Sequence, residues 1–328
     1  MAAPTGTMRA IRVFEFGGPD VLKLVEDQPI PVPAKGEVLL QVKAIGVNPS
    51  DLYTRARGQG TVQLPFIPGY DAAGVVAGFG SDVTKFKIGE RVYVALARGA
   101  YAEFMVSDAR RVHHLADHLT FSQGAAIGVP YFTSVRALKH KANVKPSDKV
   151  LVHGASGGTG LAAVQIAKSW GLDVVGTAST DEGAALVKAA GARLVLNHKD
   201  PNHEQNLKDA TGGKGFDVIL EMLASNVPLD VRVAATFGRI VVIGPGGGIP
   251  HIDPGPLILK EIAIVGLIQH LATDEEREET AKLLEDGIQK KITDPVIDQE
   301  FPLKRASQAH EAIASHTGGS KGKIIILP

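Results

Sequence analysis

Two patterns of hydrophobic residues divide the chain into unlike parts. In the first third, short apolar runs are separated by proline and glycine, and residues 37–45 (EVLLQVKAI) alternate as in a half-buried strand. Residues 10–14, 74–79 and 91–95 form further short runs of this kind. Closely spaced turn signals between short strands are typical of an antiparallel, barrel-like β domain. A helical stretch over residues 122–141 follows this region.

Near Val144 the pattern changes, and apolar strands begin to alternate with helices. The strands are predicted over residues 150–153, 174–177, 194–197, 218–221, 240–244 and 263–267. Intervening helices often stop at a glycine, as at Gly171 and Gly191, which suits a left-handed C-terminal cap. Because the strands are apolar throughout, they predict a parallel sheet covered on both faces, which is a doubly wound domain.

The alternation ends after Gly266, and the remaining residues follow a simpler pattern. Helices are predicted over residues 274–286, with Asp274 near the N-cap, and over residues 304–315. The last strand covers residues 324–327. A single strand is not stable by itself, so we expect the last one to pair with the sheet of the first domain.

The chain is therefore predicted to be an α/β protein whose doubly wound parallel sheet is inserted into a discontinuous, β-rich domain. We assign residues 1–125 and 268–328 to the β-rich catalytic domain and residues 126–267 to the inserted domain. Two domains agree with the chain length, because a typical domain holds about 100–200 residues.

The amino-acid composition of the chain excludes several kinds of chemistry. The chain has no cysteine, so it has no disulfide, no thiolate nucleophile and no cysteine-based metal site. Lysine plus arginine equals aspartate plus glutamate, at 35 each, so net charge gives no signal for nucleic-acid binding. The N-terminus lacks the apolar run of a signal peptide, and no apolar stretch reaches the roughly 20 residues that span a bilayer. We expect a soluble, cytosolic protein with no membrane partner.

The strongest chemical signal lies in residues 149–171 (KVLVHGASGGTGLAAVQIAKSWG), where an apolar strand runs into a glycine-rich turn that opens an amphipathic helix. Gly157 and Gly160 fill the last two places of the dinucleotide fingerprint, and Ala155 fills the first. Small residues are needed because a diphosphate approaches the backbone there, while the helix amides and dipole attract the anion. The alternative is a glycine-rich turn without a nucleotide, which the strand–turn–helix context disfavours.

The end of the second strand of this domain decides between the two nicotinamide cofactors. NAD-binding versions carry an acidic residue there for the ribose hydroxyls, but this chain has Ala178. Ser179 can donate a hydrogen bond to a 2′-phosphate, and His198 ends the next strand nearby, so we expect NADPH. The alternative is that Asp181 or Glu182 takes the acidic role.

Several segments, in order and along nearly the whole chain, resemble the medium-chain dehydrogenase/reductase superfamily. They are MRAIRVFEFGGPDVLKL, GVNPSDLYTR, IPGYDAAGVV, QGAAIGVPYFTS, VLVHGASGGTGLAA and EMLA. Within that superfamily the chain is similar to the zeta-crystallin group of NADPH:quinone oxidoreductases. The resemblance implies a GroES-like β-rich domain, a Rossmann domain, and a homo-oligomer (dimer or tetramer) joined through an edge strand of the Rossmann sheet.

The resemblance also implies a zinc-free enzyme. Zinc-dependent members use an early cysteine and a histidine in a Gly-His-Glu segment, and the corresponding positions here are Asn48 and Tyr70. Neither is a usual zinc ligand. The three histidines within residues 113–118 offer imidazoles, but their segment is predicted as a strand running into a loop, without the supporting partners that metal-bound histidines have.

By resemblance, Tyr53 and Asn48 line the acceptor site near the nicotinamide. The Tyr53 hydroxyl could bond to the acceptor oxygen or to the cofactor; the alternative is a tyrosine packed on a loop with its hydroxyl in water. Asn48 could instead only shape the turn before Pro49. Without a Lewis acid, alcohol oxidation is difficult, so the acceptor should already be electrophilic, as quinones and conjugated enones are.

The resemblance assigns a set of residues in strand-end loops to NADPH binding: Tyr53, Ser156, Gly157, Gly158, Thr159, Gly160, Ser179, His198, Asn226, Ile243, Gly244, Pro245, Gly246, Leu267, Ile268 and Gln269. Two departures weaken the expected grip on phosphate. Similar proteins carry an arginine after the fifth strand, where this chain has PGGG, and a glycine where it has Ser179. The segment Gly246–Gly248 is either a flexible lid or a simple turn.

Three functions follow from these observations. The first is an NADPH-dependent quinone reductase, for which the resemblance leaves one-electron transfer open. The second is an NADPH-dependent double-bond reductase of α,β-unsaturated carbonyls. The third, from another class, is a structural crystallin or an AU-rich RNA-binding protein. RNA binding rests on the resemblance alone, because aromatic residues are only 5% and no RNA-recognition motif is present.

Overall fold

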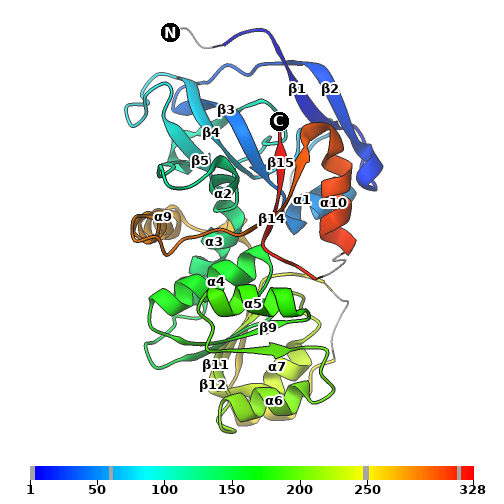
Figure 1. Cartoon of the computed structure of the whole chain (residues 1–328), viewed down its shortest axis with the longest axis vertical. Helices are drawn as coiled ribbons and strands as arrows, with labels where there is room; N and C mark the ends of the chain where they lie inside the picture. The colour runs from blue at the N-terminus through cyan, green and yellow to red at the C-terminus, as the bar shows by residue number, and fades with distance from the viewer. Residues whose placement is uncertain (1–3, 59–61, 247–250, 316–318) are drawn as a thin grey trace. The chain divides into compact units, whose positions relative to one another are not determined.

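The chain folds into two compact units, seen here in a computed structural model that describes residues 4–58, 62–246, 251–315 and 319–328. The first unit comprises Met1–Val129, Asp294–Thr317 and Gly322–Pro328, and the second comprises Pro130–Thr293 and Gly318–Lys321. The β-rich unit is thus discontinuous, as predicted, and the second unit contains the parallel sheet (Figure 1).

The first unit is built on a seven-stranded sheet in the order β14-β15-β3-β4-β5-β7, with β6 paired to β3. Its strands are β3 (Glu37–Gly46), β4 (Asp71–Phe79), β5 (Arg91–Val94), β6 (Phe104–Asp108), β7 (Val112–His114), β14 (Ile297–Pro302) and β15 (Lys323–Leu327). A separate two-stranded sheet joins β1 (Thr7–Val13) to β2 (Leu22–Pro29). The helices include α1 (Pro49–Arg57), α2 (Phe121–Ala125) and α10 (Ala306–Ser315).

The strand at the centre of this sheet is more buried than its pattern predicted. Alternation in residues 37–45 indicated a half-buried strand, yet Val38, Leu39 and Leu40 of β3 are all fully buried. Strands β4 and β6 pair with β3 on its two edges, and the side chains of Val38, Leu40 and Val42 belong to the hydrophobic core of the first unit. The polar positions Glu37, Gln41 and Lys43 are partly or fully exposed, as the alternation predicts, but Leu39 on the same face is buried, so this face is only partly open to solvent.

The C-terminal strand returns to the first unit's sheet, which confirms the prediction. β15 pairs antiparallel with β3 and parallel with β14 (Figure 1). Its residues Ile325 and Ile326 are fully buried. The apolar run at the end of the chain therefore completes the core of the first unit.

The predicted helix over residues 122–141 is interrupted. α2 ends at Ala125, α3 spans Gly128–Val135, and a π-helical segment η3 spans Arg136–Lys141. At the break, the Val129 amide donates to Asp71 Oδ2 at 2.9 Å, and a Cβ on Gly128 would lie only 2.1 Å from Asp71 Oδ1. A buried carboxylate from a distant strand therefore satisfies the backbone where the helix restarts, which local periodicity does not reveal.

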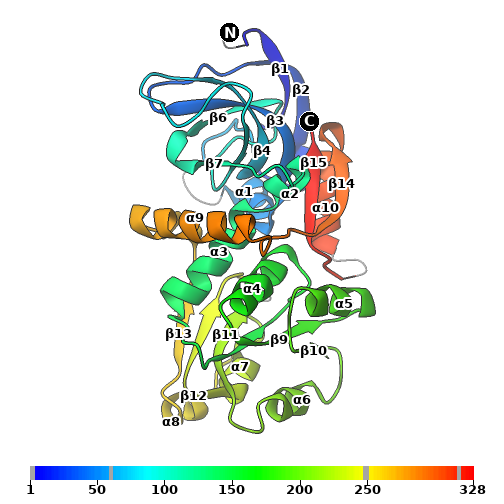
Figure 2. The same cartoon turned by 60° about the vertical axis from the view of Figure 1, so that its left-hand side comes forward.

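The second unit is a doubly wound α/β domain, as predicted. Its strands are β8 (Lys149–Val152), β9 (Asp173–Ala178), β10 (Leu194–Asn197), β11 (Phe216–Glu221), β12 (Ala234–Val242) and β13 (Ala263–Gly266). All are parallel, in the order β10-β9-β8-β11-β12-β13, and Figure 2 shows β10 and β13 at opposite margins. The chain direction across the sheet reverses between β8 and β11, which is the switch point where such folds bind ligands.

Helices cover both faces of this sheet. The helices of this unit include α4 (Gly158–Ser169), α5 (Asp181–Ala189), α6 (His203–Ala210), α7 (Val227–Val233), α8 (Pro254–Leu259) and α9 (Asp274–Gln289). α4 and α5 lie on one side, and α6 and α7 lie on the other (Figure 1). Gly171 and Gly191, which follow α4 and α5, have φ of 79° and 112°, so the left-handed caps are confirmed. Thr273 is the N-cap of α9, and Asp274 stands directly after it, near the N-cap as predicted.

Residues 268–293, assigned from sequence to the first domain, lie in the second unit. The buried guanidinium of Arg136 bonds to the carbonyls of Ile268, at 2.6 Å, and Leu271, at 3.1 Å. It also pairs with Glu276 at 2.9 Å. These contacts join the start of α9 to the second unit across more than a hundred residues of sequence, so the pattern change at Gly266 did not mark the end of that unit. Among the described residues, no helix is long and apolar enough to cross a membrane.

Candidate cofactor and acceptor sites

The glycine-rich turn after β8 leads directly into α4, and no side chain caps that helix. Gly157 is its N-cap residue, and the first turn contains no acidic residue. The first amides of a helix have no intrahelical acceptor and carry the positive end of the helix dipole. The mouth of α4 is therefore suited to an anion.

Small residues bring the backbone of this turn to the surface. Gly154 has a φ of 54°, and a Cβ on Gly160 would lie 2.5 Å from the Gly154 carbonyl oxygen. The turn is anchored to β9, because the Gly154 amide donates to Thr177 Oγ1 at 3.1 Å and the Ala155 amide donates to the Thr177 carbonyl at 2.8 Å. The result is a fixed turn with no bulky side chain over its amides.

The other predicted cofactor loops meet at the same edge of the sheet, because parallel strands all end there. The residues that follow β8 to β13 in this way are Ser156, Gly157, Gly158, Thr159, Gly160, Ser179, His198, Asn226, Ile243, Gly244, Pro245, Gly246, Leu267, Ile268 and Gln269. β9 ends at Ala178, so the expected register at that strand end is confirmed. Gly247 and Gly248, part of the predicted lid or turn, lie outside the described residues.

The loops after the last three strands are held close to one another by backbone contacts. The Ile243 amide donates to the Glu221 carbonyl at 2.8 Å, and the Leu267 amide donates to the Val242 carbonyl at 2.9 Å. A Cβ on Gly244 would lie 1.9 Å from the Met222 carbonyl oxygen. Glycine is therefore required at position 244 for the backbones following β11 and β12 to approach this closely.

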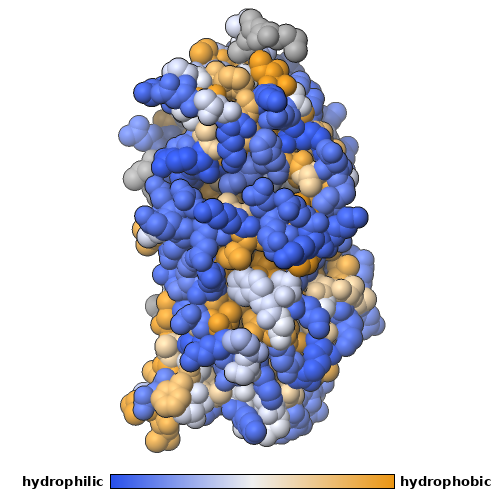
Figure 3. All heavy atoms as spheres, turned by 90° about the vertical axis from the view of Figure 1, so that its left-hand side faces the viewer, coloured by the Kyte–Doolittle hydropathy of each residue, from blue (hydrophilic) through white to orange (hydrophobic). Residues whose placement is uncertain are grey.

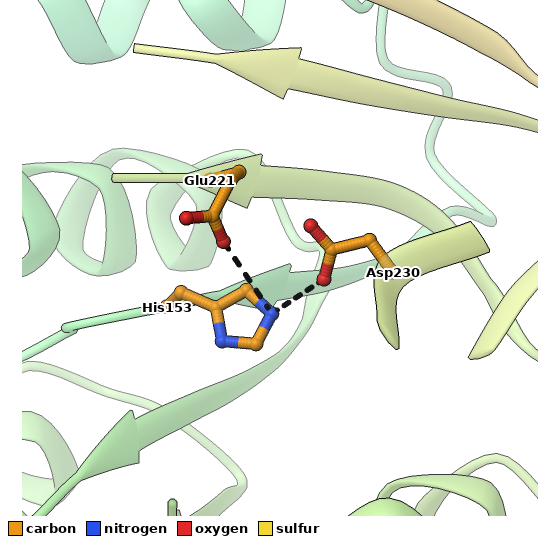
Figure 4. Close-up of side chains that lie close together, drawn as sticks. All are labelled: His153, Glu221 and Asp230. Carbon is orange, nitrogen blue, oxygen red and sulfur yellow. Dashed lines mark hydrogen bonds and ion pairs between the residues drawn. The ribbon is translucent and has the colours of Figure 1, made fainter. Parts of the chain in front are cut away.

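A buried cluster of three charged side chains lies at the switch point (Figure 4). His153 follows β8, Glu221 ends β11, and Asp230 lies in α7. His153 Nε2 donates to Asp230 Oδ1 at 2.8 Å and lies 3.9 Å from Glu221 Oε2. Glu221 in turn accepts from the Leu223 amide at 2.7 Å and from Asn226 Nδ2 at 3.1 Å.

This cluster connects two of the predicted cofactor loops. Burial alone would lower the pKa of His153, but the hydrogen bond and charge of Asp230, with the charge of Glu221, raise it. Burial raises the pKa of Glu221, although His153 opposes the shift. The two carboxylates thus favour the charged form of the imidazole, and the contacts of the cluster tie His153, directly before the glycine-rich turn, to the loop that contains Asn226.

The same three side chains are also the one group among the described residues whose atoms could share a metal ion, within 4.8 Å of one another. His153 Nε2 is already hydrogen bonded to Asp230, and Glu221 already accepts two hydrogen bonds. Hydrogen bonds within the cluster therefore already engage the atoms that would bind a metal ion.

In the first unit, Asn48 lies in a different buried cluster. Its side chain is 1% exposed, and both of its polar atoms are bonded within the protein. Nδ2 donates to Asp71 Oδ2 at 2.9 Å, and Oδ1 accepts from the ammonium of Lys323. The Asn48 backbone amide donates to Asp51 Oδ2 at 2.8 Å, which caps α1. The amide of Asn48 thus fixes the start of the helix that carries Tyr53.

A chain of hydrogen bonds extends from this cluster to α10. Arg55 Nη1 donates to His310 Nδ1 at 3.1 Å, because a guanidinium has no acceptor atom. His310 therefore carries its proton on Nε2 and donates it to the Tyr101 hydroxyl at 2.9 Å. Tyr101 donates to Asp51 Oδ2 at 3.3 Å. Burial lowers the pKa of His310 to about 3, which agrees with a neutral imidazole.

Tyr53 and the histidines of residues 113–118 have simpler surroundings. Tyr53 is half-buried on α1, and no hydrogen bond joins its hydroxyl to another described residue. β7 carries His113 against Tyr93, whereas His114 contacts Phe86. The strand-into-loop prediction for this segment is confirmed, since β7 ends at His114.

Sequence reasoning missed the residues that support these sites. Thr177 holds the glycine-rich turn, Asp230 pairs with His153, and Lys323 bonds to Asn48. Only His153 had a local signal, because it stands directly before the glycine-rich turn. The partners lie far away in sequence, and no motif marks them.

Comparisons with known proteins cover the chain from end to end. Family models described as "Alcohol dehydrogenase GroES-like domain" and "Zinc-binding dehydrogenase" match residues 34–117 and 158–286. A quinone oxidoreductase from Rattus norvegicus is 46% identical over 333 residues, which cover 100% of both chains. The Escherichia coli quinone oxidoreductase solved with NADPH is 31% identical, with a TM-score of 0.87 over 98% of this chain and 100% of its own. A mycobacterial protein solved with NADPH is 33% identical, with a TM-score of 0.87 and the same coverage.

Proposed function

Because the chain belongs to the quinone oxidoreductase family, we propose that it transfers reducing equivalents from NADPH to quinones without zinc. The observation that carries this proposal is the uncapped mouth of α4 at the switch point of the sheet, in a chain similar to quinone oxidoreductases over its full length. When bound, NADPH supplies the reducing equivalents. The protein's own residues bind it, orient it and exclude water.

The glycine-rich turn fits the diphosphate of a dinucleotide. Position 160 leaves no room for a side chain, Gly154 has a left-handed φ of 54°, and the amides of Gly158 and Thr159 open α4 without an acidic neighbour in that turn. We assign the remaining cofactor contacts to the loops that follow the other strands at this edge. Gly244, which allows the backbones after β11 and β12 to approach, supports that assignment.

The end of β9 supports NADPH over NADH. The strand ends at Ala178, so no carboxylate stands where NAD-binding folds read the ribose hydroxyls. Asp181 and Glu182 belong to the first turn of α5 and are exposed. A carboxylate at the strand end would repel a 2′-phosphate, and this strand end does not carry one.

The donors in the first unit do not suit zinc, despite the name of the matching family model. At the positions that correspond by resemblance to the zinc ligands, Asn48 offers an amide that is already bonded to Asp71 and Lys323. Tyr70 offers a phenol, 3.0 Å from Thr54 Oγ1. Zinc sites use thiolate, imidazole or carboxylate ligands, and the ammonium of Lys323 beside Asn48 would repel a cation.

We assign acceptor contact to Tyr53, with Asn48 lining the same site. The half-buried Tyr53 hydroxyl has its donor capacity available to an acceptor oxygen, because no described residue bonds to it. Asn48 acts through position, since its bonded amide and backbone cap the helix on which Tyr53 stands. We further propose the cytosol as the compartment, because a nicotinamide-dependent reductase needs a continuous supply of reduced nucleotide.

A substrate screen tests the proposed function. The purified protein is mixed with NADPH or NADH and with 1,4-benzoquinone, a conjugated enone or an aldehyde, and loss of reduced nucleotide is followed by absorbance. We expect turnover of the quinone with NADPH, unchanged after treatment with a chelator. Tyr53→Phe should lower kcat/KM by about 10-fold or more if its hydroxyl contacts the acceptor, because positioned proton donors contribute on that scale.

Three outcomes count against parts of this proposal. Loss of activity with the chelator would show that a metal ion takes part. Turnover of enones without quinones would favour the double-bond reductase. A Tyr53→Phe variant with wild-type kinetics would remove Tyr53 from the acceptor site.

We also propose a homo-oligomer formed through the edge strand β13. Ile264 of β13 and the neighbouring helix α8 expose apolar side chains, and Ile258 and Leu259 of that helix are 70% and 84% exposed. In Figure 3, a group of apolar side chains, drawn in orange, lies at the lower left of the surface. An unpaired strand edge beside exposed apolar residues favours pairing with a second copy of the same strand.

A further inference from the structure

A short C-terminal segment, Gly319–Lys321, lies against the cofactor edge of the second unit. A Cβ on Gly319 would lie 3.2 Å from Thr180 Cγ2 and 3.5 Å from Ser179 Oγ. Ser320 Cβ lies 3.5 Å from the place that a Cβ on Gly157 would take. The segment therefore borders both the mouth of α4 and the residue that follows β9.

This segment contributes a positive charge to the end of β9. Lys321 Nζ pairs with Glu182 Oε2 at 2.9 Å, and Glu182 belongs to the first turn of α5. The Lys321 side chain is 26% exposed and that of Glu182 is 69% exposed. The ammonium of Lys321 is thus held at Glu182, three residues after Ser179 in the chain. A bound dinucleotide would place its adenosine ribose at this end of β9.

The Lys321–Glu182 pair can exchange its anion. Exposed ion pairs contribute little to stability, since water and salt screen them. A phosphate monoester carries more negative charge than a carboxylate and offers three acceptor oxygens. A 2′-phosphate beside Ser179 would therefore compete well with Glu182 for the ammonium.

We propose that Lys321, together with Ser179, binds the 2′-phosphate of NADPH, and that Glu182 holds the ammonium in place before the cofactor arrives. This inference rests on the proposed function, because it assigns a specificity-determining contact to the same cofactor site. Lys321 supplies the positive charge that the PGGG sequence after β12 (residues 245–248) lacks. The proposal also gives Glu182 a role other than a hydrogen bond to a ribose hydroxyl.

Titration of variants with four probes tests this inference. NADPH, NADH, 2′-AMP and 5′-AMP are titrated into the wild type, Lys321→Met, Lys321→Arg and Glu182→Gln by calorimetry. Lys290→Met is the matched control, because Lys290 also forms an exposed pair, with Asp286 at 2.7 Å, on α9. Thermal unfolding of each variant reports whether the fold is intact.

We expect Lys321→Met to weaken NADPH and 2′-AMP binding by about 10- to 100-fold, as for loss of a charge-assisted hydrogen bond. NADH and 5′-AMP should bind within about 2-fold of wild type, because they lack the 2′-phosphate. Lys321→Arg should restore most of the NADPH affinity, and Glu182→Gln should preserve or increase it. Lys290→Met should change nothing.

Other results overturn the inference. Equal weakening of NADPH and NADH by Lys321→Met would show that Lys321 acts on the diphosphate or on the fold. Unchanged NADPH affinity would show that it makes no contact. Loss of NADH binding in Glu182→Gln would show that Glu182 reads the ribose hydroxyls. A wild type that binds neither nucleotide would overturn the proposed function instead, and this inference with it.

Discussion

Asp51 lies where two sets of hydrogen bonds meet inside the first unit. It accepts from the Asn48 amide and from the Tyr101 hydroxyl, and it is completely buried. Burial raises the pKa of Asp51 to about 7, although the Asn48 hydrogen bond and Lys323 oppose the shift. In an unfolded chain the same carboxyl would ionise near pH 4. Asp51 therefore links the stability of this unit to pH.

The sign of that linkage follows from the direction of the shift. Between about pH 4 and pH 7 the unfolded state has lost the Asp51 proton while the folded state keeps it, so Asp51 lowers stability as pH rises through this range. We predict that Asp51→Asn becomes increasingly more stable than the wild type from pH 4 to pH 7. The gain should reach roughly 2–4 kcal/mol, since each pKa unit corresponds to about 1.4 kcal/mol.

Thermal unfolding at several pH values measures this difference. The asparagine can accept the same two hydrogen bonds, so the fold should survive. Asp117→Asn, at an exposed position, is the control and should show no gain in stability over the wild type from pH 4 to pH 7. A pH-independent difference for Asp51→Asn would mean that Asp51 is ionised in the folded protein throughout this range.

At the scale of single elements, α4 is the helix on which the proposed cofactor site depends. Its N-cap, Gly157, has φ of −76° and ψ of 169°, an extended conformation open to any residue. A Cβ there meets nothing closer than 3.5 Å. Substitutions at position 157 can therefore change the charge at the helix mouth without disturbing the backbone.

We predict that Gly157→Asp binds NADPH about 10- to 100-fold more weakly than Gly157→Asn, because a carboxylate beside the diphosphate repels it by a few kcal/mol at close range. The two side chains have the same size, so only the charge differs. Titration by calorimetry measures both affinities.

The thermal stability of the same pair provides an internal check. Aspartate and asparagine are both good N-cap residues, and aspartate also complements the helix dipole, so Gly157→Asp should unfold at the same or a higher temperature than Gly157→Asn. Weaker binding together with equal or greater stability would place the anion site at α4. Equal affinity of the two variants would contradict that placement.

Elements with strong local signals were predictable, and those shaped by distant contacts were not. The strand β10 has the predicted bounds, and the glycine caps of α4 and α5 were read correctly, because periodicity and glycine conformation act locally. The break between α2 and α3 was missed, because Asp71 of β4 supplies the acceptor for the Val129 amide. A residue 58 positions away decides where that helix starts.

At the scale of the whole molecule, the proposed oligomer gives a direct prediction. Leu259→Lys places a charge among the exposed apolar side chains of α8, so it should weaken the association of two copies by about 10-fold or more, in line with loss of an apolar anchor at an interface. Sedimentation equilibrium measures the molecular mass and its concentration dependence. The wild type should sediment as a dimer or tetramer.

Val32→Lys is the matched control for this experiment. Val32 is an apolar residue of the first unit with 82% exposure, close to that of Leu259, but it lies away from β13 and α8 in sequence. It should leave the mass unchanged. A monomeric wild type would refute the oligomer, and an unchanged mass in Leu259→Lys would move the interface away from α8.

The sequence by itself determined the elements with strong local periodicity, the discontinuity of the β-rich unit and the glycine-rich turn after β8. These features follow from hydrophobic periodicity and from glycines that local backbone conformation requires, so they can be predicted from neighbouring residues in the sequence. The tertiary structure alone decided which distant side chains meet. Lys321 reaches Glu182 across 139 positions, His310 reaches Arg55 across 255, and Lys323 reaches Asn48 across 275. Such pairs leave no periodic trace, because the free energy of a contact depends on distance in space and not on distance along the chain.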